Sequence, residues 1–208
     1  MERYGELHCH TNFSFQDGAS HPAALVARAV ELDYTALAIT DHDGFRGVVK
    51  MHQAAREAGL PVVYGTEVGM PRESPPAATP QRSDAVPGAE TVHRRGRVRR
   101  MHGQKPVATP PTDHLVLLAP DPAGYAALSR FITRGQYRGR KDIPVYDGVD
   151  LAAASRDGDL VALTGCRHGA VPRAAQAGDL AGAMEEAARL RELFPGRLYL
   201  ELWHHGMP

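Results

Sequence analysis

TALAITDHDGF, residues 35–45, joins an apolar run directly to three titratable side chains. Residues 35–40 are apolar enough for a strand that is buried on both faces, as strands of parallel sheets are. Asp41, His42 and Asp43 follow at the carboxyl end of that strand, where α/β folds place ligands and catalytic groups. An ordinary turn, in which Asp43 caps the next helix, is the alternative explanation. The stretch therefore predicts an α/β fold with its chemistry at one edge of a sheet.

Short apolar runs alternate with helical patterns along the rest of the chain. We expect further strands at residues 6–10, 60–68, 114–120, 159–165 and 197–203. Helical patterns begin at Pro22 and at residues 44–58, 122–134, 149–154 and 180–194, with Gly59 ending the second helix. Repeated units of strand and helix predict a parallel sheet or a barrel.

Residues 71–112 interrupt this alternation. They are rich in proline and arginine and show no apolar periodicity, so we interpret them as a flexible insertion within a single domain of residues 1–208. Seven Lys or Arg residues lie between positions 81 and 105, against two acidic residues, in a chain of formal net charge zero. The neutral total argues against non-specific binding of polyanions by the whole chain.

The composition is that of a soluble globular protein, with 43% hydrophobic and 23% charged residues among 208. No run approaches the roughly 18 apolar residues of a membrane helix, and no secretion signal is recognisable, so we expect a cytoplasmic protein without a membrane partner. Cys9 and Cys166 are far apart, and metal or core roles explain them better than a disulfide. Eleven histidines make the chain rich in the commonest metal-binding residue.

His8 and His10 lie two residues apart in the first expected strand, so their side chains point to one face and Cys9 points to the other. Two imidazoles at one strand end form half of a transition-metal site, because each offers a neutral nitrogen that binds zinc at about 2 Å. By itself the H-x-H pattern is weak, and two exposed or hydrogen-bonded histidines are the ordinary alternative. We interpret Cys9 as a core thiol.

Further candidate ligands recur at other strand ends. Glu67 ends the third expected strand, His114 begins the fourth and Cys166 follows the fifth. Asp17 lies in the loop after the first strand, where a turn residue before a glycine is its ordinary role. The recurrence at successive strand ends favours one shared metal site, in which Asp41 would orient a histidine.

Six segments together resemble a known family. In order, they read HCHTNFSFQDGAS, ITDHDGF, YGTEVG, DHLVLLA, ALTGC and LYLELWHHG, from about residue 4 to the end of the chain. This set resembles the PHP (polymerase and histidinol phosphatase) domain in the form found at the N-terminus of bacterial C-family DNA polymerases. Within that group the sequence of these segments is most similar to the error-prone polymerases of damage-induced mutagenesis. The insertion after Glu67 is the main interruption.

The resemblance implies a distorted (β/α)7 barrel with up to three divalent metal ions, of zinc, manganese or iron, at the carboxyl ends of its strands. Matched position by position, the metal ligands are His8, His10, Asp17, His42, Glu67, His114 and Cys166. The family completes this set with a further acid-or-Asn-x-His motif on strand seven. His204 and His205 do not match that motif, so we expect a barrel without its last βα unit and an incomplete metal site.

The resemblance also implies phosphoester hydrolysis with a DNA 3′ end as substrate, as in a 3′–5′ exonuclease, because clustered metal ions activate water and bind phosphate oxygens. The candidate contacts to the DNA backbone are Arg130, Arg134, Arg138, Arg140 and Lys141. Solvated surface charge is the ordinary alternative for each. The expected partners are the other domains of a DNA polymerase, in DNA replication and damage-induced mutagenesis. Polymerase chemistry itself lies outside these residues.

Two other functions stay open. In one, the domain is not catalytic and its metal site braces an attached polymerase, which the missing last motif favours. In the other, the chain is a free-standing small-molecule phosphatase of the histidinol-phosphatase type. The LELWHHG sequence and the missing end of the barrel argue against a free-standing phosphatase.

Overall fold

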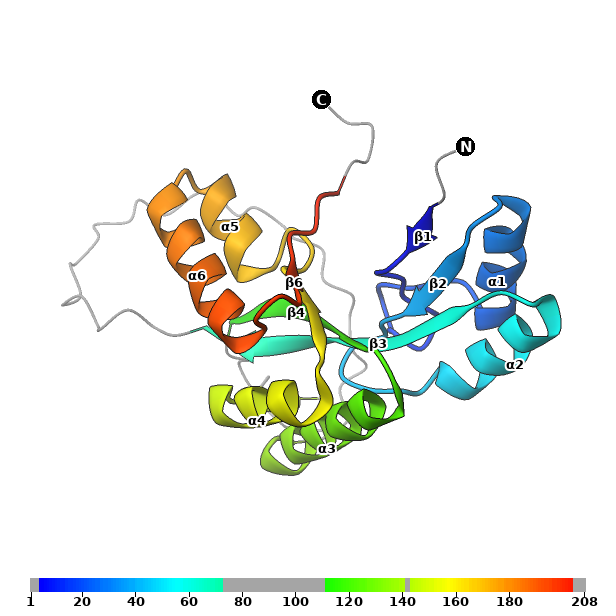
Figure 1. The fold of residues 1–208 in the computed structure, drawn as a ribbon, viewed down its shortest axis with the longest axis horizontal. Helices are drawn as coiled ribbons and strands as arrows, with labels where there is room; N and C mark the ends of the chain where they lie inside the picture. The colour runs from blue at the N-terminus through cyan, green and yellow to red at the C-terminus, as the bar shows by residue number, and fades with distance from the viewer. Residues whose placement is uncertain (1–3, 73–110, 141–142, 204–208) are drawn as a thin grey trace, which may run out of the picture.

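The computed structural model describes residues 4–72, 111–140 and 143–203. Most of the insertion, together with Lys141, His204 and His205, lies outside the described residues. The described chain forms a curled, six-stranded half-barrel sheet with six helices around it (Figure 1). For the described residues this confirms the expected α/β fold, a distorted barrel without its last βα unit.

The strands lie side by side in the order of the sequence. They are β1 (Gly5–Glu6), β2 (Ala36–Ile39), β3 (Val62–Pro71), β4 (Thr112–Ala119), β5 (Val161–Leu163) and β6 (Leu198–Tyr199). The helices are α1 (Pro22–Glu31), α2 (Val48–Ala58), α3 (Pro122–Arg138), α4 (Gly148–Gly158), α5 (Ala170–Gln176) and α6 (Leu180–Leu193). Within the described residues, β1 and β6 are the two open edges of the sheet.

β4 runs against both of its neighbours, whereas the other strand pairs are parallel. The expectation of a parallel sheet is therefore wrong at this strand. β3 and β4 pair from Pro71 opposite Thr112 to Tyr64 opposite Ala119, as two arms of a hairpin. Two helices, α3 and α4, connect β4 to β5, in place of the single crossover helix that joins neighbouring parallel strands. The start of β4 consequently lies at the same edge of the sheet as the carboxyl ends of its neighbours.

Local capping signals begin and end several helices. Asp121, Asp147 and Asp179 each accept a hydrogen bond from a backbone N–H in the first turn of α3, α4 and α6. Gly59 ends α2 in the left-handed conformation, as predicted. The short helix α5 is not predicted from the sequence, and it tolerates Pro172 because that residue lies in its first turn. No helix among the described residues has the length and apolar character needed to cross a membrane.

Both faces of β4 are buried, which fixes this strand firmly inside the fold. Leu115 and Leu117 pack into the largest core cluster, together with side chains of α3, α4 and α6. Val116 and Leu118 point to the opposite face and pack against Leu163 of β5. A separate apolar cluster lies between β2 and the helices α1 and α2. Of the candidate ligands described below, His114 lies on this strand and Glu67 lies on its neighbour β3.

Candidate metal centre

His8 and His10 lie in the segment directly after β1, which ends at Glu6 rather than at residue 10. This segment stays attached to the end of β2, because Thr40 N donates to Cys9 O at 2.9 Å and Cys9 N donates to Thr40 Oγ1 at 3.0 Å. The two imidazoles converge, with their Nε2 atoms 3.2 Å apart, while Cys9 packs against the cluster under α1 and α2. Burial raises the pKa of the Cys9 thiol to about 12, which suits a core thiol.

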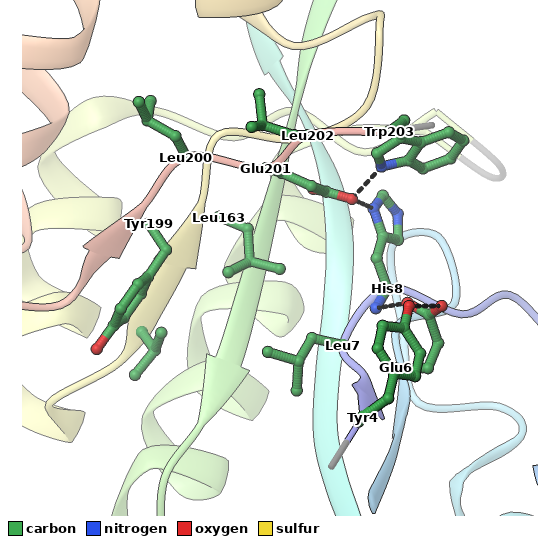
Figure 2. A pocket seen from close by; sticks show the side chains of 12 residues that line it. Tyr4, Glu6, Leu7, His8, Leu163, Tyr199, Leu200, Glu201, Leu202 and Trp203 are labelled. Carbon is green, nitrogen blue, oxygen red and sulfur yellow. Dashed lines mark hydrogen bonds and ion pairs between the residues drawn. The ribbon is translucent and has the colours of Figure 1, made fainter. Parts of the chain in front are cut away.

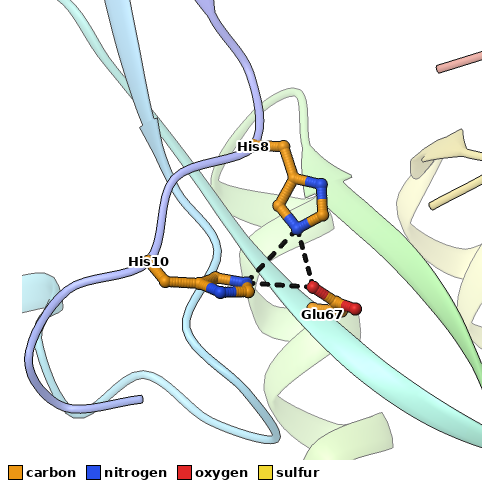
Figure 3. Close-up of side chains that lie close together, drawn as sticks. All are labelled: His8, His10 and Glu67. Atoms are coloured by element: carbon orange, nitrogen blue, oxygen red, sulfur yellow. Dashed lines mark hydrogen bonds and ion pairs between the residues drawn. The ribbon is translucent and has the colours of Figure 1, made fainter. Parts of the chain in front are cut away.

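The carboxylate of Glu67 lies at the centre of the cluster and is fully buried. Its Oε2 lies 2.7 Å from Nε2 of His8 and 2.9 Å from Nε2 of His10 (Figure 3). Its Oε1 contacts Nδ1 of His114 and lies 3.6 Å from Sγ of Cys166. Each oxygen of one carboxylate therefore faces a different group of ligand atoms.

The turn after β2 holds the backbone of Glu67. Glu67 N donates to Thr40 O at 3.2 Å, and Glu67 O accepts from Asp43 N at 2.9 Å. Asp43 has the left-handed φ of 54° and does not cap α2, whose N-cap is Gly47. Asp43 O also accepts from Nε2 of Gln136 at 2.9 Å. Gln136 is a supporting residue that sequence reasoning missed, because its contact depends on how α3 packs.

The contacts in the cluster shift pKa values in opposite directions. Burial raises the pKa of Glu67, but hydrogen bonds from three histidines outweigh burial and lower that pKa well below its usual range. Burial lowers the pKa of His8, but hydrogen bonds to Glu201 and Glu67 outweigh it and raise that pKa to about 10. The pKa of His114 also rises to about 10, where burial is outweighed by hydrogen bonds to Cys166 and Glu67. A histidine binds metal in its neutral form, so metal uptake at this cluster would release protons.

The reversed direction of β4 brings His114 to the cluster, although this residue lies at the start of its strand. Cys166 reaches it from the turn after β5, and its Sγ lies 3.4 Å from Nδ1 of His114. The turn and the strand pack closely at Gly165, which has φ of 84° and where a Cβ would lie 2.6 Å from the carbonyl oxygen of His114. A residue other than glycine would separate the two ligands.

Asp17 and His42 meet at the more exposed side of the cluster. Oδ2 of Asp17 lies 2.7 Å from Nδ1 of His10 and 2.8 Å from Nε2 of His42. The loop that carries Asp17 folds back tightly at Gly18, where a Cβ would lie 2.0 Å from the carbonyl oxygen of Thr11. This close approach keeps the Asp17 carboxylate beside the two histidine rings.

Asp41 supports the same loop and does not contact a histidine ring. Its carboxylate is buried and accepts hydrogen bonds from N and Oγ1 of Thr11, both at 2.8 Å, and from Oγ of Ser14 at 2.7 Å. Ser14 Oγ also accepts from His42 N at 3.1 Å. Asp41 is linked to His42 through Ser14, and its expected role in orienting a histidine stays a prediction. Within the described chain it stabilises the backbone that carries the cluster.

The residues matched as metal ligands lie in three overlapping groups, and within each group the ligand atoms lie within 4.8 Å of one another. The groups are His8, His10 and Glu67; His10, Asp17 and His42; and Glu67, His114 and Cys166. His10 belongs to two groups, with Nε2 toward one and Nδ1 toward the other. A neutral imidazole has one free lone pair, so His10 can bind metal in only one of them.

Glu201, just after β6, is a functional candidate that sequence reasoning missed. Its Oε1 lies 2.6 Å from Nδ1 of His8 and also contacts Nε1 of Trp203 (Figure 2). A carboxylate on Nδ1 places the proton on that nitrogen and leaves Nε2 of His8 free toward Glu67. The LYLELW segment contains Glu201, but only the curl of the sheet brings this residue near the segment after the first strand.

The described arginines considered as DNA contacts lie along α3 and directly after it, and two of them are paired with acids. Arg134 lies 2.9 Å from Asp150, and Arg138 lies 2.7 Å from the same carboxylate. Arg130 lines a small cavity beside Asp150, and Arg140 follows the end of α3. Ion pairs with Asp150 neutralise part of this positive charge. DNA contact by these residues stays a prediction.

A curled α/β half-barrel that gathers histidines, carboxylates and a thiol at one edge of its sheet places the chain among barrel proteins with a site at the strand ends. The family model of the PHP domain matches residues 6–205. The chain belongs to the PHP domain family.

The similar curated proteins are error-prone DNA polymerases. The chain is 39% identical over 208 residues to the error-prone DNA polymerase of Cutibacterium acnes (strain DSM 16379 / KPA171202). The aligned region covers 99% of this chain and 16% of the relative. It is 39% identical over 227 residues to the error-prone DNA polymerase of Nocardia farcinica (strain IFM 10152). That aligned region covers 99% of this chain and 19% of the relative. The chain thus spans less than a fifth of the length of these two relatives.

One solved structure shares the fold over nearly the whole chain. It is a candidate metal-dependent phosphoesterase from Bifidobacterium adolescentis ATCC 15703, with a TM-score of 0.51 and 19% sequence identity. The match covers 99% of this chain and 79% of that protein. At this identity the likeness shows the fold alone.

Proposed function

We propose that the chain is a metal-dependent phosphoesterase domain. Its divalent metal ions would be held by His8, His10, Asp17, His42, Glu67, His114 and Cys166. The observation that carries the proposal is the buried carboxylate of Glu67, whose two oxygens face two groups of ligand atoms at once. Metal ions held as a pair by such a carboxylate would supply the chemistry of phosphoester hydrolysis.

The donor set fits first-row transition metals. Imidazole suits zinc and iron, carboxylate suits manganese, and the thiol of Cys166 favours zinc or iron in its own group. Because Asp17 and His42 share His10 with another group, their group would be the last to fill. We therefore expect fewer than three metal ions per molecule.

The chain's own residues would hold and orient the donors. Glu201 accepts from Nδ1 of His8, and Asp17 accepts from Nδ1 of His10, so both rings present Nε2 toward Glu67. Bound metal ions would lower the pKa of a water molecule and bind a phosphate oxygen, so the reaction needs no side-chain nucleophile.

The proposed substrate is a DNA 3′ end, cleaved as by a 3′–5′ exonuclease. Support comes from the curated relatives, which are named error-prone DNA polymerases and are far longer than this chain. In that setting the proposed partners are DNA and the remaining polymerase domains. The proposed role is in DNA replication and damage-induced mutagenesis, and the proposed location is the cytoplasm.

A second candidate function is a non-catalytic module that braces an attached polymerase. A groove of about 750 Å³ lies between the open edges β1 and β6 (Figure 2). Its lining includes Leu7, Leu200 and Leu202, which are exposed apolar side chains. Exposed apolar surface of this kind marks places where further protein packs.

Metal analysis and hydrolysis assays on the same samples test the proposed function. The purified chain is loaded with zinc or manganese, its metal content is measured, and it is assayed on a single-stranded DNA and on a simple phosphodiester. We expect bound metal, and we expect Glu67→Gln and His8→Gln to lose most of it. The matched control is His21→Gln, which changes an exposed histidine at the start of α1.

The outcomes separate the two candidate functions. Metal-dependent hydrolysis that disappears in Glu67→Gln supports the phosphoesterase. Full metal content without hydrolysis of either substrate favours the bracing module. If the wild-type chain takes up no metal, both functions based on this centre fail.

A further inference from the structure

The histidine rings of the cluster form an arc that ends on a residue outside the candidate metal groups. Ring centroids lie 4.5 Å apart for His10 and His42, 5.4 Å for His42 and His114, and 5.3 Å for His114 and His168. His168 is exposed and belongs to none of the groups found among the described residues. It is therefore free to contact a molecule bound at the centre.

The turn that carries His168 is tightly built. His114 N donates to His168 O at 3.0 Å, and Gly169 N donates to Cys166 O at 2.7 Å. At Gly169 a Cβ would lie 2.2 Å from the carbonyl oxygen of Thr164, so the turn closes only with glycine there. The turn directs Cys166 inward and leaves His168 and its neighbour Arg167 on the exposed side. A turn built this closely holds the backbone of both exposed residues beside the cluster.

Arg167 brings positive charge to this side of the cluster. Its Nε donates to Nε2 of His168 at 3.2 Å, and among the described residues no carboxylate lies within 4.0 Å of its guanidinium. By contrast, the nearby Arg173 is held by Asp113 at 2.7 Å. Because Nε2 of His168 accepts this bond, the ring carries its proton on Nδ1 and has a donor to offer. A guanidinium with no carboxylate partner among the described residues, beside an N–H donor, matches the oxygens of a phosphate group.

We propose that Arg167 and His168 form a phosphate-contacting pair beside the candidate metal centre. The remaining guanidinium N–H groups of Arg167 and Nδ1–H of His168 would donate to the non-bridging oxygens of a phosphoester. This inference rests on the proposed function, because it places the phosphate at the metal centre. The pair would set affinity for the phosphate without holding metal.

Calorimetric titration of the metal-loaded chain with inorganic phosphate tests the pair. Arg167→Gln should weaken phosphate binding about ten- to hundredfold, as expected for loss of hydrogen bonds from a charged group. Arg167→Lys should weaken phosphate binding less than Arg167→Gln, because lysine keeps the charge but not the bidentate hydrogen-bonding geometry. His168→Leu should weaken binding roughly threefold to tenfold, and His168→Asn, which keeps a donor near Nδ1, should weaken it less.

The matched control is Arg156→Gln. Arg156 is exposed in the last turn of α4, which precedes the start of β5, whereas Cys166 follows the end of β5. It should leave phosphate affinity unchanged. Metal content measured on every sample should equal that of the wild-type chain.

Two results would overturn the inference while leaving the proposed function intact. One is normal metal content with the same phosphate affinity in Arg167→Gln as in the wild-type chain. The other is loss of metal in His168→Leu, which would make His168 a metal ligand. Absence of metal from the wild-type chain would overturn the inference together with the proposed function.

Discussion

Oε1 of Glu201 lies 2.6 Å from Nδ1 of His8, on the side of the ring away from Glu67. His8 follows the first strand of the sheet and Glu201 follows the last, so this contact spans the groove between β1 and β6. When the ring of His8 is neutral, this hydrogen bond keeps its one proton on Nδ1. The same contact thus links the curl of the half-barrel to the state of a candidate ligand.

Replacing Glu201 with alanine should weaken metal binding by about ten- to a hundredfold, the usual effect of removing a carboxylate behind a metal-binding histidine. Without that carboxylate, His8 can place its proton on Nε2, which faces Glu67. Affinity for zinc or manganese is measured by competition with a coloured chelator. Glu192→Ala, an exposed acid on α6, is the control. Equal affinities for the two variants would contradict the role of Glu201.

Changing Asp41 to asparagine should destabilise the fold by about 1 to 3 kcal/mol, because an amide cannot accept all the hydrogen bonds from Thr11 and Ser14. Metal affinity should also fall, since Ser14 connects this carboxylate to the backbone of His42. Urea unfolding with chelator present gives the first effect, and metal titration gives the second. The exposed Asp157→Asn should change neither quantity. A normal unfolding curve for Asp41→Asn would show that the buried network is dispensable.

Gly135 and Gly148 form a matched pair of glycines. A Cβ at Gly135 would lie 2.3 Å from the buried ring of Tyr146, whereas one at Gly148 meets nothing within 4 Å. We expect Gly135→Ala to cost about 1 to 3 kcal/mol of unfolding free energy through overpacking. Gly148→Ala should be neutral or stabilise the chain by up to about 1 kcal/mol. Urea unfolding of both variants checks this, and similar midpoints would refute the packing of Tyr146 on α3.

Without metal ions, the chain should lose stability as the pH rises from about 6.5 to about 10. His8 and His114 have folded pKa values of about 10, raised from 6.5. Their stabilising effect is therefore complete below pH 6.5 and is lost as the pH passes through about 10, with a slope of at most about 1.4 kcal/mol per pH unit for each group. The pKa of Glu67 is lowered, so its contribution is present above 4.5 and is lost only in acid.

Urea unfolding in a chelating buffer at several pH values tests this dependence. The double variant His8→Gln, His114→Gln should show a flatter profile over the same range. If both chains lose stability equally, the histidines are not the source of the effect.

Candidate ligands were predictable from the sequence where each stands beside an apolar run. His42 lies two residues after the run at residues 35–40, and His8 and His10 were expected at the end of the first strand. Local hydrophobic patterns indicate where a strand lies, since burial requires the apolar run and solvent contact permits the polar residues after it. The same patterns placed Gly59 at the end of α2. Strand lengths were less predictable, and β1 ends before the two histidines.

By itself the sequence determined the alternation of strands and helices and the residue types at the strand ends, because both follow from local periodicity. Only the tertiary structure decided that β4 runs antiparallel, which brings His114 beside Cys166. It also decided that Asp41 supports a loop and that Glu201 reaches His8. These relationships join residues distant along the chain, and they depend on strand direction and side-chain packing, which a local pattern does not encode.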